Sequence, residues 1–424
     1  MDGIKKGLWL AVFVFLWGGF PSVISGDINP NPPTFPVKLI FIHHSSGENL
    51  LTDYDGGLGI ALRDNNYFVS DTNYGWGPDS IGDLTDIGHW WLWFQGPNSS
   101  TYLNALYSEG GRHSSYSRLG QNPGGPNEII MFKSCFPNSH LDGHPDDPAT
   151  IGTNHLRGED CWSNHHSVAN AKGIYNDLLS YFATRQDTLF IAVTAPPLCT
   201  NDTDARHAAN ARALNNWLVD EWLANYAFNN VAVFDFYNVL TSDGGNSNTN
   251  DANSPTGNHH RWWNGAIQHI QTEDRNTSSY PQDSWDSHPT TAGNQKATQE
   301  FIALLNAYYH CWNGTGDCPG GYSYNLAPII DSFSADFTSG GVPSTVNFNC
   351  IAHDPDGTIT EFRWDFIGNG QTDAITSQGI TSHTYQSSGI FQVTCTVGDN
   401  SGATVQSPAL TITVTRGKGS YIRR

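Results

Sequence analysis

Positive charge is scarce in this chain. It carries 20 Lys and Arg residues against 40 Asp and Glu, which gives a formal net charge of −20 at pH 7. Nucleic acids and anionic membrane surfaces are also negatively charged and do not attract a protein of this charge, so neither is an expected partner. Charged residues of both signs make up only 14% of the sequence, and this composition, with 43 glycines, is typical of a loop-rich extracellular protein.

Long apolar runs are also lacking, apart from one near the start. Lys5 and Lys6 precede an apolar run over residues 7–20, and small residues follow up to Gly26. This order predicts a signal peptide over residues 1–26. The run is about 14 residues long, short of the roughly 20 that cross a bilayer. We therefore expect a secreted or cell-surface protein with no membrane span after cleavage, the alternative being a retained N-terminal anchor.

No Cys-x-x-Cys motif occurs among the seven cysteines, which excludes a zinc ribbon and a thioredoxin-like site. Some cysteines of an exported chain are expected to pair. Cys311 and Cys318 bracket a Gly-rich loop and are the obvious local pair, and Cys350 and Cys395 fall on two predicted strands and are a second candidate. The odd number leaves at least one thiol free or paired elsewhere.

The stretch Val37–Leu51 contains the first chemical signal. A short apolar run ends in two histidines, two serines and a glycine, and an apolar-periodic segment follows. This pattern predicts a buried strand, a tight turn and a helix, with Ser45 at the junction. Backbone N–H groups converge there and the helix dipole favours negative charge, as a nucleophilic serine requires. The alternative is a polar helix cap, since Ser is a common N-cap residue.

Strands and helices alternate along the next 250 or so residues. Further strands are predicted at 67–70, 128–133, 188–194 and 231–235, and helices at 165–183, 203–226 and 289–310, with a long polar loop over 241–287. Such alternation predicts a parallel sheet covered on both faces, with ligands beyond the carboxyl ends of its strands. The turns 43–47 and 134–139 are therefore expected to be neighbours.

An unusual Trp-rich stretch lies between the second and third predicted strands. Aromatic faces pack on sugar rings, so Trp90, Trp91 and Trp93 are candidates to line a carbohydrate cleft. The alternative is that they are core residues of a large loop.

Acyl transfer needs a nucleophile, a base, an orienting acid and an oxyanion pocket. His288, just before the last predicted helix, is the candidate base, and Asp286 and Asp283 are the nearest carboxylates that could fix its tautomer. The side-chain amide of Asn138 and the backbone N–H of Ser45 are candidate oxyanion donors. Each residue alone also fits a surface loop or turn.

These blocks resemble a known family. Ser45 after the first strand, Asn138 after the third and His288 before the last helix are similar to the Ser, Asn and His blocks of the SGNH (GDSL-like) hydrolases, over residues 37–308. The resemblance implies a flavodoxin-like three-layer α/β/α fold and hydrolysis of esters of lipids or acetylated sugars. It also implies a further oxyanion donor after the second strand, at Gly75 or Gly77.

The chain departs from the family pattern at two places. His43 and His44 replace the family's Gly-Asp before the serine, which leaves Ser46 as an alternative nucleophile to Ser45. The family's acid lies three residues before the histidine, where this chain has Trp285. Asp286 is the first candidate for the acid, with Asp283 as the alternative.

A metal site is the competing chemical hypothesis, because imidazoles suit zinc. The candidate ligands are His43, His44, His140, His144, His155, His165 and His166. Among them only His140 and His144 have His-x-x-x-His spacing, and the Gly and Pro beside His144 oppose a helix. We therefore expect no required cofactor.

The sequence period changes after residue 325. Short alternating segments over 344–350, 359–365, 390–397 and 410–415 predict a small all-β sandwich. Residues 326–415 resemble a PKD domain, on the segments 352–357, 363–365, 383–385 and 397–400 and on Gly389. The resemblance implies an Ig-like sandwich of exported proteins that acts as a spacer or a weak adhesion module.

One loop of this sandwich alternates oxygen-bearing side chains with glycines. Asp365, Asn369 and Asp373 are candidate ligands for a structural Ca²⁺, the alternative being an ordinary hairpin turn.

The expected organisation is a signal peptide (1–26), a Pro-rich linker (27–36), an SGNH-like α/β domain (37–310), a linker (311–325), a PKD-like sandwich (326–415) and a basic tail (416–424). The predicted function is that of a secreted serine esterase that removes acetyl groups from polysaccharide or related extracellular esters. The alternative is a non-catalytic structural or adhesion protein, attached to a cell surface or self-associated through the PKD-like domain.

Overall fold

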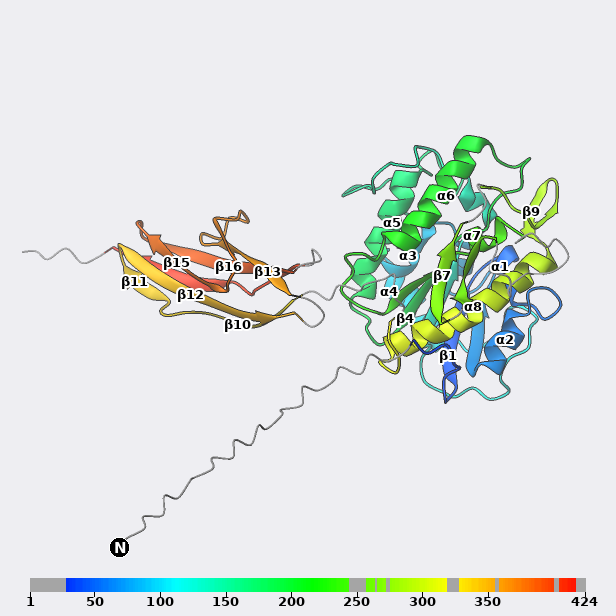
Figure 1. Cartoon of the computed structure of the whole chain (residues 1–424), viewed down its shortest axis with the longest axis horizontal. Coiled ribbons are helices and arrows are strands. Elements are labelled where there is room, and N and C mark those ends of the chain that lie inside the picture. Colours follow the sequence, from blue (N-terminus) through cyan, green and yellow to red (C-terminus); the bar gives the residue numbers. More distant parts are fainter. Residues whose placement is uncertain are drawn as a thin grey trace, which may run out of the picture.

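The computed structural model describes residues 28–243, 257–263, 265–271, 275–318, 328–354, 358–399 and 404–416. The predicted signal peptide and nearly all of the predicted basic tail lie outside these ranges. Figure 1 shows two bodies, an α/β domain and a β-sandwich.

A five-stranded parallel sheet forms the centre of the α/β domain. Its strands are β1 (Val37–Ile42), β2 (Tyr67–Thr72), β3 (Ile129–Lys133), β4 (Leu189–Val193) and β5 (Val231–Phe234), and every residue in them is buried. The strand order β2-β1-β3-β4-β5 is the flavodoxin-like doubly wound order. The predicted parallel α/β sheet is confirmed. The order reverses between β1 and β3, so ligands are expected beyond the carboxyl ends of these two strands.

Helices cover both faces of the sheet (Figure 1). One face packs against α3 (His89–Phe94), α4 (Ser99–Ser108), α5 (Val168–Phe182) and α6 (Ala205–Asp220). The other packs against α1 (Ser45–Leu51), α2 (Leu58–Asp64), α7 (Phe236–Leu240) and α8 (Thr291–Trp312). Successive strand residues enter opposite cores: Ile40 belongs to the first and Phe41 to the second. This two-sided burial explains the continuous apolar runs of the strands.

The stretch 241–287, predicted as one long polar loop, contains further structure. Two antiparallel hairpins occur in the described part of this region, β6 (His259–Trp263) with β7 (Ala266–Ile270), and β8 (Pro281–Asp283) with β9 (Asp286–Pro289). The second hairpin carries His288 and its two candidate acids. Short 3₁₀ helices also follow β2 (η1, Pro78–Asp83) and β3 (η2, Phe136–Ser139).

The described part of the predicted Pro-rich linker is packed on the α/β domain. Asn306 of α8 donates from Nδ2 to the Pro30 carbonyl (2.9 Å), and Asn66 donates from Nδ2 to the Pro33 carbonyl (2.8 Å). This segment is therefore part of the domain's surface and not a free tether.

The sandwich contains two antiparallel layers. One is β10 (Ile329–Ala335), β12 (Ser344–His353) and β15 (Ile380–Tyr385); the other is β11 (Ser339–Gly341), β18 (Leu410–Thr415), β16 (Gly389–Asp399), β13 (Ile359–Asp365) and β14 (Ala374–Thr376), with β17 (Thr404–Gln406) on β16. Within the second layer, β11 is parallel to β18. Trp364 is fully buried between the layers. The predicted all-β sandwich is confirmed.

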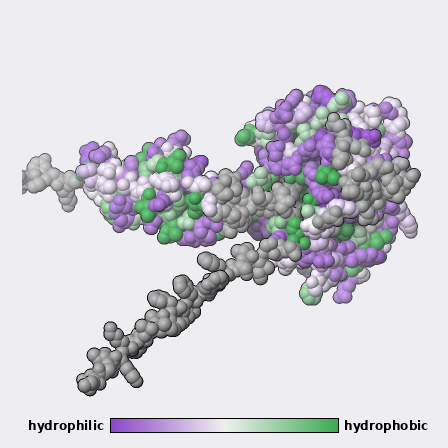
Figure 2. Space-filling model, viewed as in Figure 1, coloured by the Kyte–Doolittle hydropathy of each residue, from purple (hydrophilic) through white to green (hydrophobic). Residues whose placement is uncertain are grey.

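The surface is mostly hydrophilic, as the composition indicates. Figure 2 shows polar residues over most of the visible face of the α/β domain, with apolar residues scattered among them. Over the described ranges, no helix is both long and apolar enough to cross a membrane.

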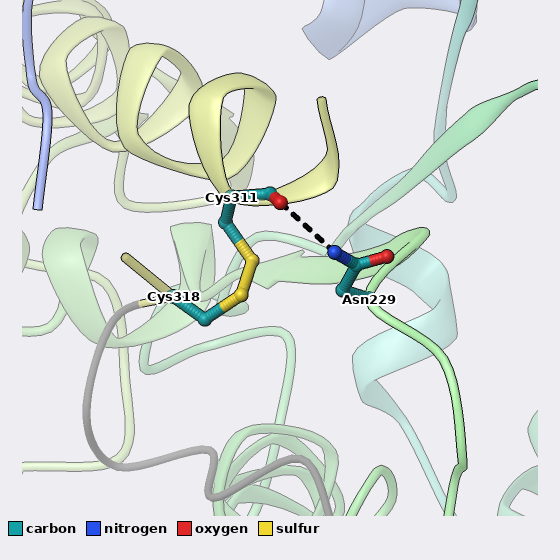
Figure 3. The surroundings of a disulfide bond; sticks show 3 residues. All are labelled: Asn229, Cys311 and Cys318. Carbon is teal, nitrogen blue, oxygen red and sulfur yellow. Dashed lines mark hydrogen bonds between the residues drawn. A yellow bond between two sulfur atoms is a disulfide. The ribbon is translucent and has the colours of Figure 1, made fainter. Parts of the chain in front are cut away.

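A disulfide closes the end of the α/β domain. Cys311, in the last turn of α8, bonds to Cys318, as predicted, and its carbonyl accepts a hydrogen bond from Asn229 Nδ2 at 2.8 Å (Figure 3). The domain therefore extends past the predicted boundary at residue 310. The second candidate pair, Cys350 and Cys395, is present as two buried free thiols that hydrogen-bond to each other.

Candidate active site

Ser45 is the first residue of α1 and lies at the junction of two neighbouring strands. Its Oγ is 3.1 Å from the Sγ of Cys135, which follows β3, and it hydrogen-bonds to the Tyr74 hydroxyl. Because β1 pairs directly with β3, the turns after them meet, as predicted. Ser45 is partly exposed there, and no described group accepts its backbone N–H.

Ser46 has a different environment. It is fully buried, its Oγ accepts a hydrogen bond from Lys133 Nζ (2.6 Å), and it lies 3.3 Å from Cys135 Sγ. A substrate carbonyl cannot reach a hydroxyl that is covered in this way. Of the two serines that the sequence left open, only Ser45 is accessible.

His288 is paired with Asp286 on β9. The imidazole Nδ1 is 2.6 Å from Asp286 Oδ1, and the same oxygen accepts the His288 backbone N–H at 3.0 Å. Residues two apart on a strand point to one face, which explains how a carboxylate at this spacing reaches the ring. The contact occupies Nδ1, while Nε2 has no partner among the described residues. Asp283 instead accepts the backbone N–H of Trp285 at 2.7 Å.

The surroundings of Asp286 favour its ionised form. Partial burial opposes ionisation, but the hydrogen bonds from the His288 backbone and imidazole outweigh it and lower the pKa of Asp286. The side chains of His288 and Asp286 are 28% and 41% exposed, so the pair is open to solvent and to a ligand.

The serine and the histidine lie in adjoining elements. Helix α1 packs against β9, and the Phe136 ring meets the His288 ring edge-on at 4.7 Å. Phe136 follows Cys135, which contacts Ser45. No hydrogen bond joins Ser45 to His288 within the described parts of the chain. Catalytic hydrogen bonds are often long without substrate, so this geometry is compatible with acyl transfer.

The predicted oxyanion donors Asn138 and Gly75 are not free in this structure. The buried Asn138 amide donates to Asp86 Oδ1 (2.6 Å) and the Cys135 carbonyl (3.3 Å). The Gly75 N–H donates to Asp83 Oδ1 at 2.7 Å. The amide of Asn138 fixes the loop after β3, and the amide of Gly75 fixes the turn before η1.

The predicted Trp-lined cleft is wrong. Trp90 and Trp93 are fully buried, and their indole N–H groups donate to Ser134 Oγ (2.9 Å) and the Leu84 carbonyl (2.6 Å). Both belong to α3 and pack in the core on its buried face, and Trp91 is partly buried with the Arg157 guanidinium over its ring at 6.0 Å. Trp90 and Trp93 are three residues apart and therefore share one face of the helix.

Two other aromatic side chains are exposed beside the site. Tyr74, which hydrogen-bonds to Ser45, is 63% exposed, and Trp285, in the turn that joins Asp283 to Asp286, is 71% exposed. The sequence alone shows only that Trp285 occupies the position where the SGNH pattern has its acid.

The candidate metal ligands are engaged in other contacts. His43 Nε2 pairs with the buried Asp71 at 3.2 Å, and His44 Nδ1 contacts Thr85 Oγ1 at 3.1 Å. Across the residues that the structure describes, no group of three or more His, Cys, Asp and Glu side chains could hold a metal ion.

In the sandwich, the proposed calcium loop is a hydrogen-bonded turn. Asp365 accepts backbone N–H groups from four residues, Ile367 to Gly370, and Asp373 accepts that of Phe366 at 2.7 Å. The Asn369 side chain accepts the N–H of Gln371 at 2.9 Å. These oxygens stabilise the turn itself, which favours the hairpin alternative.

Lys133 and Cys135 are site residues that sequence reasoning missed. Lys133 ends β3 and is fully buried; burial lowers the pKa of its ammonium to about 8. Burial opposes ionisation of the Cys135 thiol, but nearby Lys133 and the Ser45 and Ser46 hydroxyls outweigh it and lower its pKa. The available signal was a lysine at the end of an apolar strand, next to the predicted site.

The comparisons with known proteins concern the sandwich. A family model described as PKD domain matches residues 333–412. The PKD1 domain of Vibrio anguillarum Epp is 32% identical, with 22% of this chain and 99% of that chain covered and a TM-score of 0.18. Residues 333–412 form a PKD domain. The PKD1 domain of the Vibrio cholerae metalloprotease PrtV is similarly related, at 30% identity over 21% of this chain and 98% of that one, with a TM-score of 0.17.

A further solved structure is matched over only part of its length. It is described as a carbohydrate-binding module of the β-sandwich superfamily, and is 31% identical over 23% of this chain, with a TM-score of 0.21. The match spans only 38% of that chain. No curated protein matches this sequence.

Proposed function

We propose that the α/β domain is a serine ester hydrolase of the SGNH type, with Ser45 as nucleophile, His288 as base and Asp286 as acid. The observation that carries the proposal is the 2.6 Å contact between Asp286 and His288 Nδ1, which leaves Nε2 available on a hairpin packed against the helix of Ser45. The strand order and the position of Ser45 beyond β1 support it.

The residues would divide the reaction in the following way. Ser45 Oγ attacks the ester carbonyl as His288 Nε2 takes its proton, and Asp286 stabilises the imidazolium. The Ser45 N–H donates to the developing oxyanion. The bond to the leaving alkoxide then breaks as His288 returns the proton to it. Water attacks the acyl-serine with His288 as base, which releases the acid and restores Ser45. A rotation of the Ser45 side chain away from Cys135 would precede the first step.

We propose an acetylated neutral polysaccharide as the substrate. The exposed rings of Tyr74 and Trp285 beside the site offer faces for sugar rings. The net charge of −20, with Asp283 and Asp286 at the site itself, opposes polyanionic glycans. A secreted location and a spacer or adhesion role for the PKD domain complete the proposal.

Hydrolysis of p-nitrophenyl acetate by the wild type, Ser45→Ala and His288→Ala proteins tests it. We expect both variants to lose about 10³-fold or more in kcat/KM. Ser46→Ala is the matched control for the neighbouring buried hydroxyl, and it should retain far more activity than Ser45→Ala. Equal rates in the wild type and the two site variants would overturn the mechanism.

A non-catalytic extracellular role is the second candidate. It is favoured by the absence of a Ser45–His288 hydrogen bond among the described residues and by the engaged amide of Asn138. A folded protein that hydrolyses no acetyl ester and attaches to a surface or to itself through the PKD domain would support this role.

A further inference from the structure

A buried cation lies directly behind the candidate nucleophile. Lys133 is fully buried, and its Nζ donates to Ser46 Oγ (2.6 Å) and to the Ser134 carbonyl (3.0 Å). Among the described residues, no carboxylate forms an ion pair with it. An unpaired buried charge costs several kcal/mol, so a nearby group that can become anionic would stabilise the lysine.

The Cys135 thiol is that group. Its Sγ lies 3.1 Å from Ser45 Oγ and 3.3 Å from Ser46 Oγ, the hydroxyl to which Lys133 donates, and the Ser46 backbone N–H also points to it. A cation and several hydrogen-bond donors around one sulfur stabilise the thiolate over the thiol. Cys135 is also partly exposed as a residue, and its sulfur lies 3.1 Å from the hydroxyl of the accessible Ser45.

Another free cysteine near the site provides a contrast. Burial and the adjacent Asp86 carboxylate raise the pKa of the Cys161 thiol, which therefore stays protonated and unreactive. Cys161 thus provides an internal control for the reactivity of Cys135.

We propose that Cys135 is a thiolate paired with Lys133, that hydrogen peroxide oxidises it, and that the product blocks acyl transfer at Ser45. The last part rests on the proposed function; the first two do not. The sulfur attacks one peroxide oxygen, so an S–O bond forms and the O–O bond breaks. Hydroxide leaves and takes the proton from the oxygen now bound to sulfur, which makes water. Sulfur loses two electrons and peroxide gains them, which gives a sulfenate.

The position of the sulfur explains the expected loss of activity. Only 3.1 Å separates Cys135 Sγ from Ser45 Oγ, so an added oxygen on the sulfur competes with the ester carbonyl for the space around the nucleophile. It also provides a strong acceptor that would hold the Ser45 hydroxyl away from His288.

The test treats the folded full-length protein with hydrogen peroxide and traps sulfenate with dimedone, followed by peptide mass spectrometry. We expect the Cys135 peptide to be labelled about tenfold or more faster than the Cys161 peptide. Lys133→Met should slow this labelling about tenfold, with circular dichroism as the check on folding. Should that variant not fold, Ser46→Ala, which removes one donor to the sulfur, should slow labelling about threefold.

Esterase activity is followed in the same samples. It should decline at the rate of Cys135 labelling, and whatever activity Cys135→Ala retains should not decline. The proposal that Cys135 is a thiolate would be refuted if Cys135 were labelled no faster than Cys161. It would also be refuted if the Lys133 and Ser46 changes left the labelling rate unaffected. Equal peroxide sensitivity of Cys135→Ala would overturn the block at Ser45. Fast labelling of Cys135 in a protein that hydrolyses no ester would instead refute the proposed function, while the proposal that Cys135 is a thiolate would still hold.

Discussion

Asp286 and His288 are separated by a single residue on β9, and this spacing determines which carboxylate contacts the imidazole. Side chains two apart on a strand share a face, so Asp286 meets the imidazole directly while Ser287 between them is buried. Asp283 lies across the hairpin turn and is hydrogen-bonded to Trp285. An acid two residues before the histidine therefore suits a histidine carried on a strand.

The first prediction separates these two carboxylates. Asp286→Asn should lower kcat about 10²- to 10⁴-fold, because an amide cannot fix the same tautomer or stabilise the imidazolium. Asp283→Asn, the matched control, should keep most of the wild-type kcat. Steady-state kinetics on p-nitrophenyl acetate measure both. A larger loss in Asp283→Asn than in Asp286→Asn would contradict the assignment.

The candidate residues could be picked out from the sequence more readily than their surroundings could. Ser45, His288 and Asp286 follow from the positions of polar residues at the ends of predicted elements. The engagement of Asn138 with Asp86, and of Gly75 with Asp83, depends on loops that fold back over long separations. No local pattern records such contacts.

Among the elements, the β6–β7 hairpin is linked to the end of β5 by an ion pair between a partly exposed histidine and a buried aspartate. His269 of β7 lies 2.9 Å from the fully buried Asp235, which follows β5. Burial opposes the charge on His269, but Asp220 and Asp235 outweigh it and raise its pKa to about 9. A raised pKa means that the pair stabilises the fold fully below about pH 6.5, and that this stability is lost as pH rises through about 9.

The second prediction concerns this pair. Asp235→Asn should lower the free energy of unfolding of the α/β domain by about 3 kcal/mol at pH 6, because it removes the buried anion beside His269 and leaves only the exposed Asp220 at 3.7 Å. The loss should shrink above pH 9, as measured by urea denaturation at both pH values. Asp146→Asn is the control within the same domain: it breaks an exposed pair with His144 at 3.6 Å, worth about 0–1 kcal/mol. A cost at pH 6 no larger than that of the control would contradict the role of the pair.

The third prediction compares two tryptophans. Trp93→Ala should cost about 3–5 kcal/mol of stability, because it empties a core position beneath α3. Trp285→Ala should change stability by less than about 0.5 kcal/mol, since the ring is exposed, but should raise KM for acetylated polysaccharide. Thermal unfolding and polysaccharide kinetics measure the two effects. A small stability change in Trp93→Ala together with a raised KM for the polysaccharide, and no change of KM in Trp285→Ala, would instead support the Trp-lined cleft.

Helices and strands were predicted from the sequence most successfully where they are buried. The five strands of the sheet are buried on both faces and therefore appear as apolar runs. Helix α3 was not predicted because its six residues are nearly all aromatic and show no polar face. The hairpins β6–β7 and β8–β9 were not predicted because His, Asp and Ser hold them through specific contacts, which hydrophobic periodicity does not detect.

At the scale of the whole molecule, the chain joins an α/β domain to a PKD domain, each with its own hydrophobic core. The α/β domain ends with the Cys311–Cys318 disulfide, before the first strand of the sandwich. Its candidate site is built wholly from residues of that domain. Composition and the change of hydrophobic period predicted this division, but the closing disulfide extended the first domain beyond its expected end.

The fourth prediction follows from this division. A chain that ends after Cys318 should keep the kcat and KM of the full-length protein on p-nitrophenyl acetate, because no sandwich residue belongs to the proposed site. It should lose only functions that need the PKD domain, such as attachment to a surface. A drop of more than about tenfold in kcat/KM, with the α/β domain still folded, would contradict the independence of the two domains.

We propose Ser45 as a nucleophile that His288 activates, and reaction of the folded protein with a serine-directed fluorophosphonate, followed by peptide mass mapping, tests this role directly. We expect one adduct on Ser45, no adduct in Ser45→Ala, and labelling slowed about 10³-fold in His288→Ala. An adduct on Ser46, or no adduct at all in the folded wild-type protein, would contradict it.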